Sequence, residues 1–243
     1  MGTAFQITAE LATPLILSGD TYLTLDALLS GTIFEGTGSV ERALTEIPLD
    51  RSHGVWHGSA AFLDSCAIRT SAPFGAGLRT RDVDSGSLER LALARIRAGK
   101  RRGEFAKIDT QRSFYQSTLV HYGAYCTPRV YWFGSGEIEK VEALLREVPA
   151  IGKKRRQGYG QVEHIEIESI EEDVSLSRLV RGERQPMRPI VLEAWEALYG
   201  TPEVASLGCT RCAPPYFKGV AQMCAIPPAR EVFWRKFDQR FVL

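Results

Sequence analysis

The sequence lacks both a long apolar run and a large net charge. No apolar stretch in its 243 residues reaches the length of about 18 residues that a membrane-spanning helix needs. Met1–Glu10 has no basic segment followed by an apolar one, so no secretory signal is expected. The formal net charge of +1 gives no support to nucleic-acid binding from total charge alone. We expect a cytoplasmic protein without membrane contact.

Cysteine is also scarce, and its count is odd. The five cysteines are Cys66, Cys126, Cys209, Cys212 and Cys224. An odd number in a chain that can bury a core without staples favours reduced thiols over a disulfide framework. Cys209, Cys212 and Cys224 could together supply three zinc ligands. A single CxxC without a partner pair is a weak signal, so we expect free thiols, no metal and no cofactor.

The charges that are present are segregated along the chain. Six basic residues lie between Arg95 and Lys107 against a single acid, Glu104, and Lys153–Arg156 is an unbroken basic run. In contrast, Glu163–Asp173 carries six acids and no lysine or arginine. The near-zero total therefore hides two segments that can bind phosphate locally.

Hydrophobic periodicity predicts alternating strands and helices. In order, we expect a strand at Phe5–Leu11, a helix at Leu25–Ile33 with Thr24 as a possible cap, a strand at Val55–Leu63, a strand at Arg129–Phe133, a helix from Ser135 to Pro149 and a strand at Gln161–Ile170. Strands show alternation or aromatic enrichment, and helices show a stripe of period 3.6. This β-α-β-β-α-β order predicts an α+β, ferredoxin-like fold, of the kind also called RRM-like.

Two regions lie outside that pattern. The core is expected at residues 1–63 and 126–173, with an insertion at 64–125 between the second and third strands and an extension at 174–243. The insertion is too long for a plain loop, and the spacing from Ser87 to Gly99 predicts a helix in it. A short helix is expected at Ile190–Tyr199 in the extension.

The most informative segment is the cationic loop, Ile151–Val162, ahead of the last core strand. Glycines at 152, 158 and 160 permit positive φ and close approach to a ligand, while Lys153–Arg156 can neutralise several phosphates. The segment matches neither G-x-x-x-x-G-K-[ST] nor G-x-G-x-x-G after a first strand, so nucleotide hydrolysis is unsupported. The alternative is a solvated basic turn with glycines that serve geometry alone.

In its form and place the loop resembles the glycine-rich signature of the RAMP superfamily of CRISPR-associated proteins. The basic insertion likewise looks like the thumb of RAMP backbone subunits. Ala12–Leu17 and Leu23–Leu29 resemble the start of the third Csf protein, the Cas-five-like subunit of type IV systems. Ala213–Tyr216 and Cys224–Pro227 resemble that family's tail.

The resemblance implies a non-catalytic subunit of an antiviral effector ribonucleoprotein. It would hold the 5′ handle of the guide RNA (crRNA) beside a Cas-seven-like backbone and a large subunit, for RNA-guided DNA targeting. A secondary hypothesis adds contact with the target duplex near the protospacer-adjacent motif. The residues expected to bind RNA are Gly152, Lys153, Lys154, Arg155, Arg156, Gly158, Tyr159 and Gly160 in the loop, and Arg95, Arg97, Lys100, Arg101, Arg102, Lys107 and Arg112 in the insertion. Tyr159 would stack on RNA or brace the loop.

The main alternative is a Cas-six-like endoribonuclease that processes guide RNA on the same fold. Such an enzyme needs a general base, for which His53, His57 and His121 are the candidates. Their spacing is not diagnostic, so ordinary hydrogen-bonded or surface histidines are expected, as for His164. Asp26 on the first helix needs no more than a capping or surface role. Trp132, Trp195 and Trp234 are expected in the core, and Trp56 in the core or at an interface.

Overall fold

The chain divides by internal contacts into two units in the computed structural model. One unit comprises Met1–Thr70 and Ala124–Leu243, and the other comprises Ser71–Gly123. The structure describes residues 2–17, 22–76, 118–200, 206–216, 219–227 and 233–234. The predicted helix from Ser87 to Gly99 lies outside the described residues. The boundaries expected for core, insertion and extension stay a prediction.

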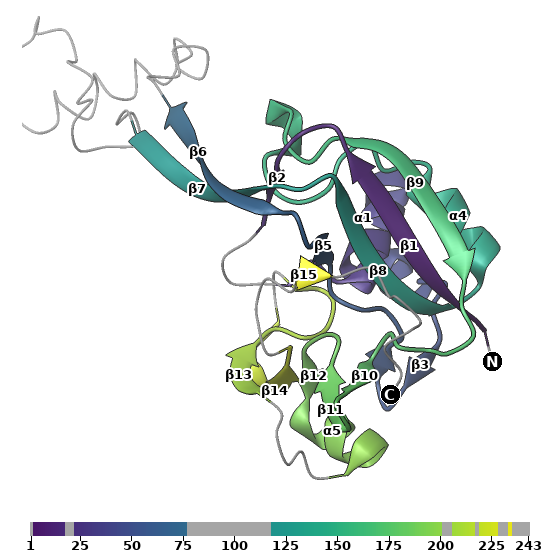
Figure 1. The fold of residues 1–243 in the computed structure, drawn as a ribbon. Helices are drawn as coiled ribbons and strands as arrows, with labels where there is room; N and C mark the ends of the chain where they lie inside the picture. The colour runs from purple at the N-terminus through teal and green to yellow at the C-terminus, as the bar shows by residue number, and fades with distance from the viewer. Residues whose placement is uncertain are drawn as a thin grey trace, which may run out of the picture. The chain divides into compact units, whose positions relative to one another are not determined.

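The first unit contains a five-stranded sheet in the order β15-β5-β8-β1-β9 (Figure 1). Its strands are β1 (Thr3–Leu11), β5 (Phe62–Asp64), β8 (Arg129–Gly136), β9 (Val162–Ser169) and β15 (Phe233–Trp234). β1 pairs antiparallel with both β8 and β9, and β5 pairs antiparallel with β8. Only β15 among these strands pairs in parallel, with β5. The protein is therefore a mixed α/β chain with mostly antiparallel sheets, which is compatible with the expected ferredoxin-like fold.

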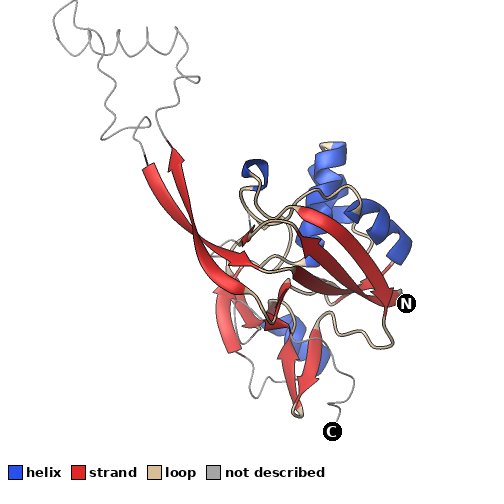
Figure 2. Cartoon of the chain, turned by 45° about the horizontal axis from the view of Figure 1, so that its top comes forward, coloured by secondary structure: helices blue, strands red, loops and turns tan. Residues whose placement is uncertain are grey.

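Two helices cover one face of this sheet, as Figures 1 and 2 both show. α1 (Leu25–Thr37) follows β1, and α4 (Ile138–Leu145) joins β8 to β9. The main core lies between them and the sheet, where Ile7 of β1 is paired with Trp132 on one side and Ile167 on the other. Alternate residues of each strand point into this core, as period-two patterning requires.

The opposite face of the sheet is apolar at β5 and β8 and polar at β1 and β9. At β5 and β8, Phe62 and Phe133 pack with the buried Met187 from the segment after β9. At β1 and β9, the same face carries cross-strand pairs such as Thr8 with Glu166. The side of this face near β9 is thus polar and acidic.

Smaller elements complete the described part of the chain. They are β2 (Leu15–Ile16), α2 (Val40–Thr45), β3 (Arg51–Ser52), β4 (Val55–Trp56), β6 (Ile68–Ala76), β7 (Thr118–Cys126), the 3₁₀ helix η2 (Arg155–Gln157), β10 (Ser177–Val180), β11 (Glu183–Pro186), β12 (Ile190–Val191), α5 (Leu192–Tyr199), β13 (Ser206–Thr210) and β14 (Gln222–Ile226). They form the sheets β2-β7-β6, β3-β4, β10-β11 and β12-β14-β13. None of the helices within these ranges is long and apolar enough to cross a membrane.

Most predicted elements are confirmed, but three boundaries are wrong. The helix expected at Ile190–Tyr199 begins only at Leu192, because Ile190–Val191 forms β12 and pairs with β14. Val55–Leu63 is not one strand, because the chain turns after Trp56, where the amide of Gly58 donates to the Trp56 carbonyl at 2.8 Å. The predicted helix does not open at Ser135, since pairing of β8 with β1 continues to Gly136. At Gly136 pairing with β1 overrides the local helical pattern, whereas at Gly58 a local turn interrupts the predicted strand.

Candidate nucleic-acid interface

The cationic loop closes on itself at its base. Ala150 forms an isolated antiparallel bridge with Gln161. The amide of Ile151 donates to the Gly160 carbonyl at 2.8 Å, and the amide of Val162 donates to the Pro149 carbonyl at 3.0 Å. The loop is therefore a defined extension of the turn between α4 and β9.

A second set of bonds attaches the loop to the connection between β1 and β2. The amides of Lys153 and Gly160 donate to the carbonyls of Ile16 and Pro14, each at 2.8 Å. The amide of Gln161 donates to Thr13 Oγ1 at 2.9 Å. The N-terminal segment and the loop, far apart in sequence, thus form one framework.

Geometry explains each of the three glycines. Gly152, Gly158 and Gly160 have φ of 78°, 86° and 63°, a region that residues with a Cβ rarely adopt. A Cβ on Gly152 would lie 2.5 Å from the Ile16 carbonyl oxygen, and one on Gly160 would collide with the Ile151 carbonyl. Nothing lies near the Cβ position of Gly158. The amides of Gly158 and Gly160 donate inside the protein, so these two amides are already occupied.

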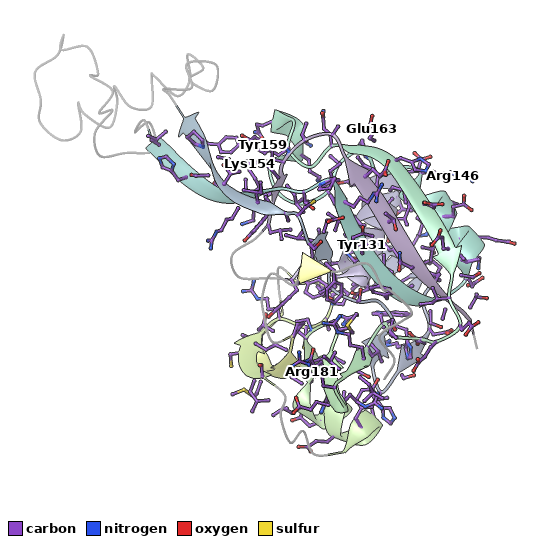
Figure 3. The ribbon with its side chains drawn as sticks, in the orientation of Figure 1. Tyr131, Arg146, Lys154, Tyr159, Glu163 and Arg181 are labelled. Atoms are coloured by element: carbon purple, nitrogen blue, oxygen red, sulfur yellow. The ribbon has the colours of Figure 1, made fainter. Side chains whose placement is uncertain are left out.

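The loop's four cations differ in availability. Lys153 and Arg156 are exposed, and no carboxylate within the described residues pairs with either. Arg155 bonds Glu35 of α1 through Nη2 at 2.7 Å, with both side chains about half exposed. Such exposed pairs contribute about 0–1 kcal/mol, so a phosphate can replace the carboxylate. Lys154, with φ of 62°, starts the 3₁₀ helix and lies close to Tyr159 in Figure 3.

The other predicted RNA-contact residues, which belong to the insertion, lie outside the described residues. They are Arg95, Arg97, Lys100, Arg101, Arg102, Lys107 and Arg112. The strand that follows the loop has the opposite charge. Strand β9 carries three exposed acidic residues, Glu163, Glu166 and Glu168. Exposed cations and exposed acids therefore follow one another closely along the chain. The exposed carboxylates of β9 repel a polyanion, which distinguishes this strand from the loop.

A buried polar cluster lies elsewhere in the same unit and was missed by sequence reasoning. Asp26 was expected at the surface or as a cap, but it is fully buried and forms an ion pair with Arg188 at 3.1 Å. Tyr216 donates to Asp26 Oδ2 at 2.7 Å and accepts from Thr24 Oγ1 at 2.9 Å. Thr24 precedes α1 but makes no side-chain cap. Arg188 also donates to the carbonyl oxygens of Trp56, Gly58 and Cys212.

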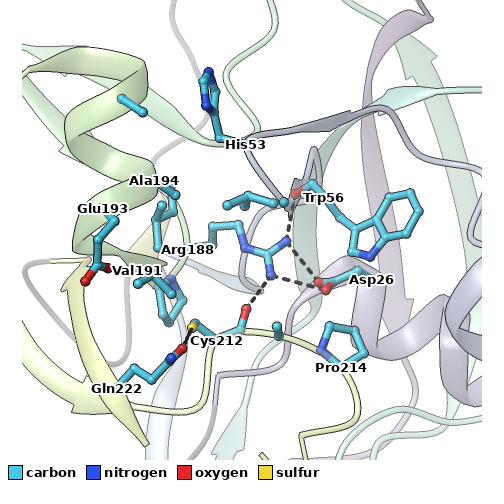
Figure 4. A pocket seen from close by; sticks show the side chains of 16 residues that line it. Asp26, His53, Trp56, Arg188, Val191, Glu193, Ala194, Cys212, Pro214 and Gln222 are labelled. Atoms are coloured by element: carbon cyan, nitrogen blue, oxygen red, sulfur yellow. Dashed lines mark hydrogen bonds and ion pairs between the residues drawn. The ribbon is translucent and has the colours of Figure 1, made fainter.

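The Asp26 carboxylate raises the pKa of both of its partners in this cluster. Burial by itself lowers the pKa of Arg188, but the Asp26 carboxylate and Tyr216 outweigh it and raise the value. Burial and the same carboxylate raise the pKa of Tyr216. The pair lies beside a cavity of about 390 Å³ whose lining includes Trp56, Glu193 and Gln222 (Figure 4). Because Arg188 is buried and donates to protein acceptors, this cluster offers no free cation to a ligand.

The predicted tryptophans and cysteines can be placed in part. Trp132 and Trp195 are buried, as expected, whereas Trp56 is half-buried under the guanidinium of Arg51 at 5.0 Å. Trp234 belongs to β15. The five cysteines are free, and no metal-binding group of histidine, cysteine or carboxylate side chains occurs in the described ranges. A hydrogen bond with Cys224 lowers the pKa of Cys212 to about 7 against the effect of burial.

The histidines have separate surroundings. His53 lies in the turn between β3 and β4, and His164 is exposed on β9. His121 Nδ1 lies 3.2 Å from Ser71 Oγ. His57 is held between two side chains, Ser52 and Asp173. Within the described residues, none of these contacts is with the cationic loop.

The fold is that of an α+β protein with a mainly antiparallel sheet. Its cationic loop is fixed at the base by hydrogen bonds and lies directly before strand β9. A comparison with protein families matches residues 3–179 to CRISPR type IV associated protein Csf3. Because the match spans well over half of the sequence, the chain belongs to the Csf3 family, and the predicted resemblance to the third Csf protein is confirmed. The family is that of a type IV CRISPR effector subunit. A comparison with curated proteins found no match.

Proposed function

We propose that this chain binds the guide RNA of its effector complex through the cationic loop, as a ferredoxin-like RAMP subunit of the Cas-five-like kind. The observation that carries this proposal is the exposure of Lys153 and Arg156 on a loop whose base is fixed by hydrogen bonds. A fixed base keeps the cations on one surface, so binding a phosphate chain costs little ordering entropy. Arg155 adds a third cation to this surface when a phosphate replaces Glu35 as its partner.

The 5′ handle of the RNA is the proposed ligand segment. The chain would sit beside a Cas-seven-like backbone and a large subunit, and contact with the duplex near the protospacer-adjacent motif would be a secondary role. Base identity is then read by guide–target pairing, while the protein supplies charge and shape. RNA cleavage is not part of the proposal, because in the described residues the side-chain partners of His57 and His121, two of the candidate bases, lie outside the cationic loop.

The test is the salt dependence of binding to a labelled repeat-derived RNA. The variant Lys153→Ala/Arg156→Ala removes two exposed loop cations. Each lost single-strand phosphate contact reduces the slope of log K against log[salt] by about 0.7, so a decrease of about 1.4 is expected. A slope equal to that of the native protein would contradict the proposal.

A matched control is available on α4 and just after it. Lys140→Ala/Arg146→Ala removes the same two residue types from exposed positions that already pair with Glu137 and Glu142. Its net charge change equals that of the loop variant, so it should leave the slope within about 0.3 of the native value. Equal losses in both variants would mean nonspecific attraction by total charge. Site-specific cleavage of the RNA by the native protein would instead favour the endoribonuclease.

A further inference from the structure

Three side chains from separate elements form a connected chain of hydrogen bonds. His57 Nδ1 lies 2.6 Å from Asp173 Oδ2, and His57 Nε2 lies 2.8 Å from Ser52 Oγ. Ser52 belongs to β3, His57 follows β4, and Asp173 lies in the connection from β9 to β10. The order serine, imidazole, carboxylate is that of an activated serine nucleophile.

A neutral His57 carries one ring hydrogen, and the carboxylate partner decides on which nitrogen. A carboxylate only accepts hydrogen bonds, so Nδ1 carries the proton and donates to Asp173. The lone pair of Nε2 is then directed at the Ser52 hydroxyl, which donates to it. Asp173 Oδ1 is oriented in turn by the amide of Ser175 at 2.8 Å. Burial raises the pKa of Asp173, but the hydrogen bonds from His57 and Ser175 outweigh it, so the pKa lies below its usual value.

The backbone after Ser52 supplies a second, independent feature. His53 and Gly54 have φ of 48° and 81°, the two positive values that a two-residue hairpin turn between β3 and β4 requires. In the described part of the chain, the amides of His53 and Gly54 donate to no protein acceptor. An amide directly after a nucleophilic serine is a common oxyanion donor. His53 and Gly54 line the cavity of about 390 Å³, whereas Ser52, His57 and Asp173 are not among its lining residues.

We propose that Ser52 is a nucleophile toward carboxylic esters, with His57 as its general base and Asp173 as a positioning residue. Ser52 Oγ forms a bond to the ester carbonyl carbon while its proton passes to His57 Nε2. The carbon–oxygen bond to the alcohol then breaks, and the alcohol leaves with that proton. His57 then deprotonates a water, whose oxygen bonds to the acyl carbon as the bond from that carbon to Ser52 Oγ breaks. The proton returns from His57 to Ser52 Oγ, and the acid is released. This site is separate from the cationic loop, so its test is independent of RNA binding.

The direct test is labelling of the full-length native protein with a fluorophosphonate, which phosphonylates activated serines with loss of fluoride. Intact-mass analysis should show one adduct, and peptide mapping should place it on Ser52. Ser65→Ala, which removes another exposed serine, should label like the native protein. Ser52→Ala and His57→Ala should lose the adduct. No adduct on folded native protein, or an adduct that persists in Ser52→Ala, overturns the proposal.

The variant Asp173→Asn tests whether the carboxylate positions the His57 ring or only supports the β3–β4 hairpin. The amide keeps the shape of the carboxylate but can donate to Nδ1, which favours the tautomer with a proton on Nε2. The labelling rate should fall at least about tenfold while the melting temperature changes little. Asp173→Glu should recover part of that rate. A rate unchanged in Asp173→Asn would overturn the assigned role of the carboxylate.

Discussion

The Arg155–Glu35 pair on the cationic loop and the Arg188–Asp26 pair in the interior join the same two chemical groups, at 2.7 and 3.1 Å. Their side chains are 43% and 57% exposed in the first pair and 1% and 0% exposed in the second. In water the first pair is weak and exchangeable, whereas the second holds charges that have lost their hydration. Exposure, not residue type, therefore decides which arginine can meet a ligand.

The largest expected effect comes from breaking the interior pair. Arg188→Ala leaves Asp26 buried without its cation, which should lower the free energy of unfolding by about 3–5 kcal/mol. Arg155→Ala should lower it by about 0–1 kcal/mol. Urea titrations of both variants measure the difference. Equal losses would show that the two pairs do not differ as their exposure requires.

Next in size is the effect of side chains at the loop glycines. Gly158→Ala meets no neighbour and should cost about 1–2 kcal/mol from its left-handed backbone alone. Gly160→Ala should cost more, because its Cβ collides with the Ile151 carbonyl and displaces the bond from Gly160 to Pro14. Urea unfolding measures both. A loss in Gly158→Ala at least as large as in Gly160→Ala would contradict this account of the loop's base.

A smaller effect should follow when Arg155 is released from its partner. Glu35→Gln removes a bond worth about 0.2–1 kcal/mol, so RNA affinity should rise about 1.5- to 5-fold at low salt. Glu46→Gln is the control, since it makes the same charge change beside Arg42 on α2. RNA titrations by fluorescence anisotropy measure both. A gain in the control as large as in Glu35→Gln would mean that Arg155 itself does not bind.

The smallest expected effect is a pH dependence that involves Asp173. Because its folded pKa lies below the usual value of 3.8, the ionised carboxylate stabilises the folded state above that pH. This contribution is lost as pH falls through the lowered folded pKa. Asp173→Asn should therefore show a flatter loss of melting temperature on acidification than the native protein. Parallel acid profiles would contradict the assigned hydrogen bonds.

Local patterns were sufficient for the elements with strong periodicity. The alternation at Phe5–Leu11 and the stripe at Leu25–Ile33 became β1 and α1, because burial of one face requires that spacing. The prediction of one strand at Val55–Leu63 was wrong, because the turn at Gly58 depends on hydrogen bonds rather than on apolar content. The predicted insertion cations lie outside the described residues, so of the predicted RNA contacts only those in the loop could be placed.

The sequence by itself determined the family, the order of strands and helices, and the place of a glycine-bearing cationic loop. Those properties are written in residues that are close along the chain. Only the tertiary structure decided which charges face water, that Asp26 and Arg188 neutralise each other inside, and that Ser52, His57 and Asp173 meet. Such contacts join residues up to 162 positions apart. No local pattern encodes them, because folding brings their elements together through burial of the core.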